Sequence, residues 1–327
     1  MKTAVLALTR GGGELARHLA TALNAEIINL EGRSIKTVIR ELWSQYDGFI
    51  FIMAAGIVIR IIAPLLHDKK TDPGIVVMDE AGQYAISLLA GHLGGANELA
   101  HAAAEAAGGK AVITTSSDTL GLTPLDLWAR FQRLRLVKGS FITLSAKLVN
   151  NGRLKVHLDN IRGELPPDFE VEDDPALADL IISNRRQPGH AAILYPKNII
   201  LGIGCNRGVK TKDIEFAVDE ICREFNLLRP AIDKIASIDL KADEKGLLDF
   251  ARRNKLPIFF YSANRLNTVS GVERSELVHR HTGAYGVAEP AAILNSGADH
   301  LLCRKKKWRD VTIAIAERPT LITPDYR

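Results

Sequence analysis

The segment DPGIVVMDEAGQYAISLLAGHLGGANELA, residues Asp72–Ala100, contains the sequence features that decide the fold. Apolar runs on both sides of the turn-forming residues Glu80-Ala81-Gly82 predict a β-hairpin over Gly74–Leu89. A glycine-rich loop, Gly91–Gly95, follows, and the alanine-rich segment Ala96–Ala107 predicts a helix that ends at a glycine pair. Strands that lead through glycine-rich loops into helices are typical of α/β proteins.

The residues before and after this segment repeat the pattern of strand, turn and helix. Asp47–Met53 is almost entirely apolar, as expected of a parallel strand covered on both faces. A turn at Gly11–Gly13 precedes the segment Glu14–Leu23, whose leucines have helical spacing. We therefore predict a Rossmann-like N-terminal α/β domain over residues 1–130, with a mostly parallel sheet. Its other predicted elements are strands at Thr3–Thr9, Glu26–Leu30 and Lys110–Thr115 and helices at Ile35–Trp43 and Ile57–Leu65.

The rest of the chain divides into two further parts. Prolines interrupt short strands over residues 131–195, where Leu154–Leu158 and Leu180–Ser183 are the clearest strands, and we predict a small middle α/β module there. Residues 196–327 predict a C-terminal α/β domain, which makes the whole chain α/β. Its predicted elements are strands at Asn198–Ile203 and Pro257–Tyr261, a glycine loop at Gly202–Gly208, helices at Thr211–Phe225, 243–253 and Val287–Asn295, and a hairpin of His300–Arg304 with Val311–Ala316 around a basic turn, Arg304–Arg309.

Composition restricts the class of protein and of partner. The 327 residues carry 42 Lys and Arg against 38 Asp and Glu, a net charge of +4, which suits an anionic small molecule but is too weak to indicate nucleic acid. Three cysteines without Cys-x-x-Cys spacing argue against a disulfide framework and against a structural metal site. No apolar run approaches the length of about 20 residues that spans a bilayer, and the start lacks a signal-peptide cleavage site. We expect a cytoplasmic protein without a membrane partner.

The loop after the predicted hairpin gathers chemically active side chains. His92 lies between glycines just before a helix, and its ordinary pKa of about 6.5 suits a general base or acid. Glu98 and Asp118 are the nearby acids that could orient His92 or a water, so we predict His92, Glu98 and Asp118 as catalytic residues. The alternative is a flexible loop with a surface histidine, followed by a capped turn. The substrate-binding residues predicted in this region are Gly91, Gly94, Gly95, Asn97, Thr115 and Ser117.

Other candidate binding residues follow other strands. Gly56 and Arg60 come after the strand at Asp47–Met53, where a ligand could approach the backbone and Arg60 could pair with a carboxylate; helix–sheet packing is the alternative. In the C-terminal domain, Gly204, Asn206 and Glu289 are predicted to bind substrate, although Glu289 could simply stabilise a helix N-terminus. Two further features have mainly structural interpretations: Cys205 as a buried thiol rather than a nucleophile, and Asp79 and Glu80 as β-turn residues.

A second kind of site is possible at the first turn. Gly11, Gly13 and Ala16 fit the Gly-x-Gly-x-x-Gly/Ala pattern between a strand and a helix, and Glu31 follows at the spacing of an acid that binds a nicotinamide ribose. The match is short, and a plain tight turn is the alternative.

The chain resembles the CbiG family of cobalamin biosynthesis. The resemblance is carried by GFIFIMAAGIVIR (Gly48–Arg60), Asp72–Ala100, VITTSSD (Val112–Asp118), SAKLVNNGRLKV (Ser145–Val156), GIGCNRG (Gly202–Gly208) and GVAEPAAILNSG (Gly286–Gly297). It extends over nearly the whole chain, and the last two motifs are also similar to the smaller CobE-type module. ITTSSD departs slightly from the family's more usual Thr-x-x-Asp pattern.

The resemblance implies a hydrolase, a substrate and a set of partners. The substrate would be cobalt-precorrin-5A, an anionic cobalt-containing tetrapyrrole with a δ-lactone, and the enzyme would open the lactone and release acetaldehyde. Cobalt would arrive with this substrate, so no cofactor and no protein metal site are expected. Other enzymes of the cobalamin pathway could receive the product, and a homodimer is left open. The alternatives are a corrinoid carrier without turnover and an NAD(P)-dependent oxidoreductase that uses the glycines near Gly11.

Overall fold

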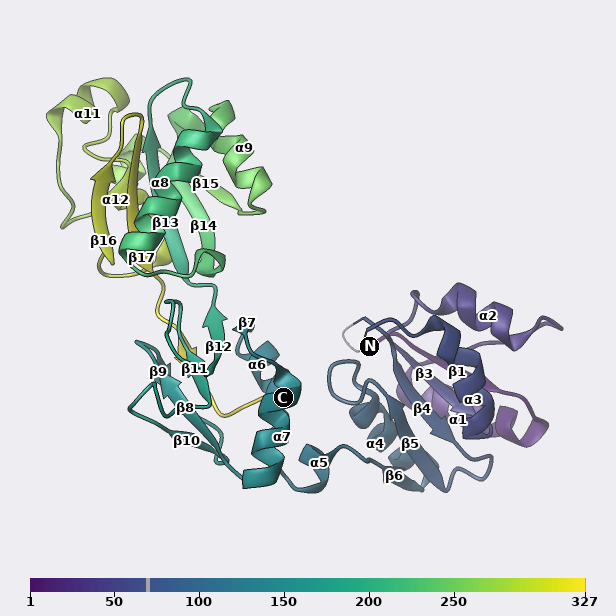
Figure 1. Cartoon of the computed structure of the whole chain (residues 1–327). Coiled ribbons are helices and arrows are strands. Elements are labelled where there is room, and N and C mark those ends of the chain that lie inside the picture. The colour runs from purple at the N-terminus through teal and green to yellow at the C-terminus, as the bar shows by residue number, and fades with distance from the viewer. Residues whose placement is uncertain (69–70, 327) are drawn as a thin grey trace. The chain divides into compact units, whose positions relative to one another are not determined.

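The computed structural model describes residues 1–68 and 71–326 (Figure 1). The chain forms two compact units, and each is considered by itself. The first consists of Met1–Trp128 with Leu148–Gly152, and the second of Ala129–Lys147 with Arg153–Arg327. Within the described residues, no helix is both long enough and apolar enough to cross a membrane.

The first unit is built on a six-stranded sheet with the order β2-β1-β3-β4-β5-β6. Apolar positions on α1 and α4 pack on one face of this sheet, and those on α2 and α3 pack on the other. The strands are β1 (Thr3–Ala7), β2 (Glu26–Ile27), β3 (Gly48–Ile52), β4 (Gly74–Met78), β5 (Tyr84–Leu89) and β6 (Lys110–Val112). The helices are α1 (Arg10–Leu23), α2 (Ile35–Leu42), α3 (Ala55–Ile62) with the 3-10 turn Ala63–Leu65, α4 (Ala96–Ala107), α5 (Ser116–Thr119) and α6 (Leu125–Phe131).

The sheet is mixed, because one hairpin reverses the strand direction. β2, β1, β3 and β4 are parallel, β5 is antiparallel to β4, and β6 is parallel to β5. The turn is held by Asp79, whose carboxylate accepts the backbone N–H groups of Ala81, Gln83 and Tyr84. As a result, β5 and β6 end at the edge of the sheet where β1, β3 and β4 begin.

The central strands confirm the expectation from composition. All five residues of β3 are buried, as is typical of a strand covered by helices on both faces. On the face toward α2, the rings of Trp43, Phe49 and Phe51 stack with centroid separations of 5.9 and 5.8 Å. These stacked rings are large apolar groups removed from water, which is the main favourable contribution to folding.

The prediction of a separate turn at Gly11–Gly13 is wrong. The three glycines form the first turn of α1, because Thr9 caps the helix: its side-chain oxygen accepts the backbone N–H of Gly12 at 3.1 Å. Helix α3 likewise begins at Ala55, two residues earlier than its sequence predicted. In both cases the helix starts almost directly after the preceding strand.

The second unit contains two five-stranded sheets, with the orders β10-β8-β11-β12-β7 and β15-β14-β13-β17-β16. The strands are β7 (Leu134–Lys138), β8 (Leu154–Leu158), β9 (Arg162–Gly163), β10 (Phe169–Val171), β11 (Leu180–Ile182), β12 (Ala192–Pro196), β13 (Ile199–Cys205), β14 (Ile232–Ile238), β15 (Ile258–Tyr261), β16 (Cys303–Lys307), β17 (Val311–Glu317) and β18 (Leu321–Ile322). The helices are α7 (Phe141–Asn151), α8 (Thr211–Glu224), α9 (Lys245–Arg253), α10 (Ala263–Asn267), α11 (Glu276–Thr282) and α12 (Ala288–Ser296), with 3-10 turns at Arg229–Ala231 and Asp239–Lys241.

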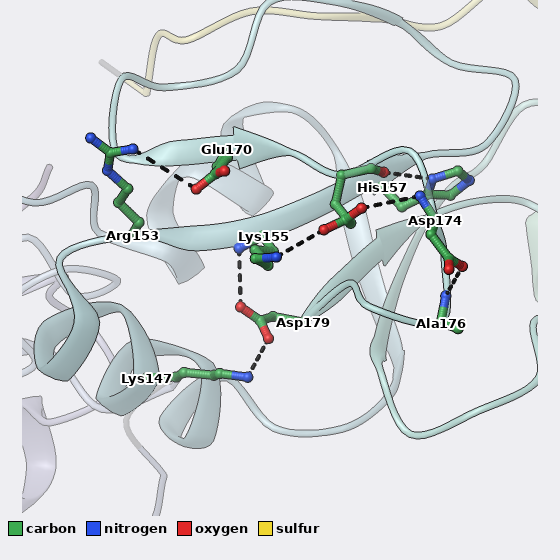
Figure 2. A network of polar contacts seen from close by, with 9 residues as sticks. Lys147, Arg153, Lys155, His157, Glu170, Asp174, Ala176 and Asp179 are labelled. Carbon is green, nitrogen blue, oxygen red and sulfur yellow. Dashed lines mark hydrogen bonds and ion pairs between the residues drawn. The ribbon is translucent and has the colours of Figure 1, made fainter.

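A charged network stabilises the first of these two sheets (Figure 2). Lys155 of β8 forms an ion pair with Glu172 at 2.9 Å, and its backbone N–H donates to Asp179, which also pairs with Lys147 of α7. His157 of β8 contacts the backbone carbonyl of Glu172 through its Nδ1. These contacts hold the loop after β10 and the end of α7 against β8.

Polar contacts and a chain crossing join the two sheets of this unit. The side-chain amide of Asn184 donates to Asn198 and to Glu317, which links the end of β11 to the outer end of β17. After β17 the chain returns to the first of the two sheets, where β18 pairs with β9 and Thr323 contacts Gln132. The last described residues therefore pack against residues 129–196.

Two local predictions for this unit are wrong. Gly202–Cys205 belongs to β13 rather than to a loop, because all four residues pair with β17 in an antiparallel register. Arg304–Lys307 belongs to β16 rather than to a turn, because β16 is an edge strand of the five-stranded sheet and charged side chains can point outward there. Strand β14, which was not predicted, lies between β13 and the edge strand β15.

Gly202 is required where α12 crosses β13. A Cβ at this position would overlap the carbonyl oxygen of Ala288, whereas a Cβ at Gly204, two residues along the same strand, would make ordinary contacts with Val287 and Thr312. We expect Gly202→Ala to lower the free energy of unfolding by about 2–3 kcal/mol and Gly204→Ala to change it by less than about 0.5 kcal/mol. Urea denaturation of the two variants tests this, and equal effects would contradict it.

Candidate functional site

A cavity lies in the first unit at the carboxyl ends of β1 and β3, where the order in which the chain adds strands reverses. From β1 the chain passes to β2 on one side and then to β3 on the other, so the carboxyl ends of β1 and β3 flank a topological switch point, where open α/β sheets bind ligands. The cavity there has a volume of about 520 Å³. It is lined by Leu8, Thr9, Ile52, Met53, Ala54, Ala55, Ile57, Val77, Met78, Asp79, Glu80, Tyr84, Ile86 and Val112.

Helix α3 carries Gly56 and Arg60 and borders this cavity, although neither residue is part of the lining. Its first turn supplies Ala55 and Ile57 to the lining, and no side chain caps its N-terminus. Gly56 and Arg60 are both exposed, and the Ile57 side chain also remains 43% exposed. An apolar surface beside an exposed cation suits a ligand that has both a hydrophobic body and carboxylates.

The acids of the hairpin turn have structural roles in the same place. Burial opposes ionisation of Asp79, but the backbone N–H donors around it prevail and lower the pKa of its carboxyl group. The Glu80 carboxylate lies directly against Gly11 at the N-terminus of α1, where a Cβ would clash with it. Because this carboxylate occupies the position in which a nicotinamide dinucleotide would place its pyrophosphate, the geometry disfavours the dinucleotide hypothesis. Glu31, its proposed ribose ligand, is exposed.

His92 lies at the opposite edge of the sheet, between two carboxylates. Its Nε2 is 2.7 Å from Oδ2 of Asp118, and its Nδ1 is 3.4 Å from Oδ1 of Asp126. Asn97 donates to the same Asp118 oxygen at 3.0 Å and accepts the hydroxyl of Ser87 at 2.7 Å. The prediction that His92, Asn97 and Asp118 lie together agrees with this geometry.

The glycines around His92 permit close packing of the loop. A Cβ on Gly91 would meet the Asn97 side chain, and one on Gly94 would meet Ala90. Gly95, the residue before α4, has φ of +76°, a left-handed conformation that favours glycine. These positions thereby bring His92 over the N-terminal turn of α4, next to the start of β4 at Gly74.

The two carboxylates determine the charge of His92. The hydrogen bond that the ring donates to Asp126 is the main influence, and together with Asp118 it outweighs partial burial and raises the pKa of the His92 imidazole. A carboxylate at each nitrogen favours the doubly protonated ring, which makes His92 better suited to donate a proton than to act as a base. Because the carboxylates lie on opposite sides of the ring, they do not converge on one point. Within the described residues, no cluster of His, Cys, Asp or Glu is suited to hold a metal ion.

A serine also lies near the ring. The Ser117 hydroxyl is 3.5 Å from Nε2 of His92, so Ser117, His92 and Asp126 have the connectivity of a nucleophilic triad. The shorter contact of Nε2 with Asp118, at 2.7 Å, competes with this role because it keeps Nε2 protonated. The arrangement is therefore better suited to proton donation than to activation of Ser117.

Several predicted residues have other positions. Glu98 is exposed, and in the part of the chain that is described its side chain makes no hydrogen bond; Asp118, not Glu98, contacts His92. Thr115 is partly buried and precedes α5 without capping it. Gly56 and Arg60 belong to the opposite edge of the sheet from His92, because β5 runs antiparallel to β4. Ser87 and Asp126 were not predicted from the sequence: Ser87 lies within the predicted hairpin of the Asp72–Ala100 segment, and Asp126 lies outside the motifs quoted above.

The candidates of the second unit have mainly structural contacts. Glu289 is buried, and its two carboxylate oxygens accept the backbone N–H groups of Glu273 and Lys305. Asn206 donates to the side chain of Asp310, and Gly204 lies within β13. Burial raises the pKa of the Cys205 thiol to about 11, which supports the interpretation of a thiol without nucleophilic character.

Comparisons with known proteins agree with this architecture. Two family models match the chain: Cobalamin synthesis G N-terminal over residues 37–118, and Cobalamin synthesis G C-terminus over residues 199–316. A protein of Priestia megaterium named cobalt-precorrin-5A hydrolase is 35% identical over 97% of this chain and 95% of its own length. The chain belongs to the CbiG family. A relative of the same name from Salmonella typhimurium is 32% identical over 95% of this chain and 96% of its own length.

Membership of the CbiG family confirms the resemblance inferred from the motifs. The N-terminal family match includes His92 and ends at Asp118, so Asp126 lies outside it. Protein CobE from a Sinorhizobium species is 29% identical over 38% of this chain and 82% of its own length, which agrees with the similarity to a smaller module.

The raised pKa of His92 has a consequence for stability. Because the unfolded imidazole has a pKa of about 6.5, the stabilisation from His92 is complete below that pH and is lost as the pH rises through the higher folded pKa. We expect the difference in free energy of unfolding between the wild type and His92→Gln to shrink as the pH is raised from 6 to 9. Urea denaturation at several pH values measures this, and a difference that does not change with pH would contradict it.

Proposed function

We propose that this chain is a cobalt-precorrin-5A hydrolase, which opens the δ-lactone of its substrate and releases acetaldehyde to give cobalt-precorrin-5B. The observation that carries the proposal is the match to relatives of that name along 95–97% of the chain. Both terminal family models also occur, in the same order. No feature of the site favours a carrier or an oxidoreductase.

The proposed reaction consumes one water. Water adds to the lactone carbonyl, and the ring C–O bond breaks to leave a carboxylate and a carbinol. A base then removes the carbinol proton, the adjacent C–C bond breaks, and its electron pair passes into the conjugated ring as acetaldehyde leaves. The substrate's own macrocycle is the electron sink, and its cobalt is part of the substrate. The protein has to supply a proton donor, a proton acceptor and donors to a developing oxyanion.

The groups around His92 match these requirements. Protonated His92 would donate a proton to the departing lactone oxygen, and Asp118, whose side chain is 28% exposed, would accept one from water or from the carbinol. Asn97 would orient Asp118 through the hydrogen bond at 3.0 Å, and the backbone N–H of Gly94 would donate to the oxyanion, because that of Gly95 already donates to the His92 carbonyl. Ser117 and Thr115 would contact the substrate beside His92.

Substrate binding is proposed to use more than one surface. Gly56 and Arg60 are proposed to hold an outlying carboxylate side chain of the substrate, since the cavity beside α3 lies at the edge of the sheet opposite His92 and does not take the reacting ring. Gly204 and Asn206 are proposed contacts in the second unit, whereas the saturated hydrogen bonds of Glu289 favour a structural role for it. The cytoplasm as the compartment and handover to later enzymes of the pathway are part of the proposal; free thiols at Cys205, Cys222 and Cys303 support a reducing compartment.

Acetaldehyde release tests the proposed reaction. Cobalt-precorrin-5A is incubated anaerobically with the protein, and acetaldehyde is measured with an aldehyde-specific assay. We expect one acetaldehyde per cobalt-precorrin-5B formed. A spectral change on binding without acetaldehyde would instead indicate a carrier, and the absence of both would reject the proposal.

Loss of the proton donor should abolish most of the activity. We expect His92→Gln and Asp118→Asn to lower kcat about 10²–10⁴-fold, the usual contribution of a general acid or base. Glu105→Gln, an exposed change on α4, is the control and should retain full kcat. Full activity in both site variants would exclude the assigned roles.

Arg60 should contribute to binding rather than to the chemical step. Loss of one charge-assisted hydrogen bond predicts a rise in KM of about tenfold for Arg60→Gln, with kcat unchanged. Arg40→Gln, an exposed change on the neighbouring α2, should leave both constants unchanged. Steady-state kinetics separate the two cases, and a fall in kcat alone would contradict a binding role.

A further inference from the structure

Asp126 is a component of the His92 site that no motif indicates. It follows the first residue of α6, whereas Asp118 comes from α5, so two different helices bring carboxylates to the two nitrogens of one ring. The Asp126 side chain is as buried as that of His92, each 14% exposed, while Asp118 is 28% exposed. The carboxylate of Asp126 thus lies on the inner side of the ring, and that of Asp118 lies on the more open side.

The position of the Asp126 carboxylate is itself fixed. Its Oδ1 accepts the backbone N–H of Leu127 at 3.0 Å, and the same oxygen lies 3.4 Å from Nδ1 of His92. As an acid in the first turn of α6, it is also favoured by the partial positive charge at a helix N-terminus. A carboxylate held in this way can fix the orientation of an imidazole.

We propose that Asp126 is a positioning residue of the hydrolase reaction, which holds the Nδ1–H side of His92 so that Nε2 points its proton to the side of Asp118 and the substrate. This inference rests on the proposed function and assigns an inner carboxylate to the proton donor. Asp126 does not touch the reacting atoms; it acts through His92. Among the described residues, the charged groups that face the ring are Asp126 from α6 and Asp118 from α5, with the neutral Asn97 and Ser117 beside them.

The arrangement predicts a particular effect of charge. In Asp126→Asn the side chain keeps its size and an oxygen near Nδ1, but it loses the negative charge that favours the protonated ring. We expect the His92 pKa to fall in this variant. Because a protonated donor is required, activity falls as pH rises through that pKa, so the alkaline limb of the kcat profile should move to lower pH.

The test combines NMR titration of the His92 ring with pH profiles of acetaldehyde release. For Asp126→Asn we expect the lower pKa, a fall in kcat of at least about tenfold at neutral pH and a KM within twofold of the wild type. Asp126→Glu, which keeps the charge, should recover part of kcat, and Glu105→Gln should change neither readout. An unchanged His92 pKa together with an unmoved alkaline limb in folded Asp126→Asn would overturn the proposal.

Two further outcomes are distinguishable. If Asp126→Asn does not fold, the ring ¹⁵N shifts of the wild type decide: protons on both nitrogens at pH 7 support the proposal, and a neutral ring overturns it. If the wild type releases no acetaldehyde, the proposed function fails, while the NMR titration still tests whether Asp126 controls His92. A loss of activity in Ser117→Ala as large as that in His92→Gln would replace the proposal with a nucleophilic serine.

Discussion

The reversal of strand direction between β4 and β5 determines where the functional groups of the first unit lie. A tight turn makes this reversal, and the Asp79 carboxylate satisfies three of its backbone N–H groups. Since β5 and β6 then run opposite to β1, β3 and β4, the loops that follow them emerge at the other edge of the sheet. One sheet therefore carries a cavity at one edge and the His92 cluster at the other.

The His92 cluster depends on a balance of burial and charge. A partly buried imidazolium would be costly alone, but two carboxylates and two neutral polar side chains surround it. The site has two carboxylates for one imidazole, and this excess of negative charge favours the protonated ring. Close packing of the glycine loop against Asn97 and Ala90 fixes the ring at this position. The loop glycines thus act mainly by allowing close packing, and this packing fixes the position of the His92 ring.

The sequence was sufficient to predict those parts of the fold that depend on local patterns. Helix α4 and strand β8 have the predicted bounds, because alanine-rich and apolar runs with glycine boundaries determine them locally. The convergence of His92, Asn97 and Asp118 also follows from residues in two loops after adjacent strands. Gly56 and Arg60 could not be separated from this group by sequence. Their distance from His92 depends on whether β5 runs parallel or antiparallel to β4. Asp126 was not predicted, because its contact with His92 arises from the tertiary placement of α6, and β14 was missed because polar residues interrupt its apolar pattern.

The central claim is that this chain uses water to open a lactone, with His92 as the proton donor. It is tested most directly by a single turnover of cobalt-precorrin-5A in ¹⁸O-labelled water, followed by mass spectrometry of the cobalt-precorrin-5B formed. The account predicts one ¹⁸O atom in the carboxylate freed from the lactone. Product without label at that carboxylate would show that the lactone opens by elimination, and would contradict attack of water on the lactone carbonyl.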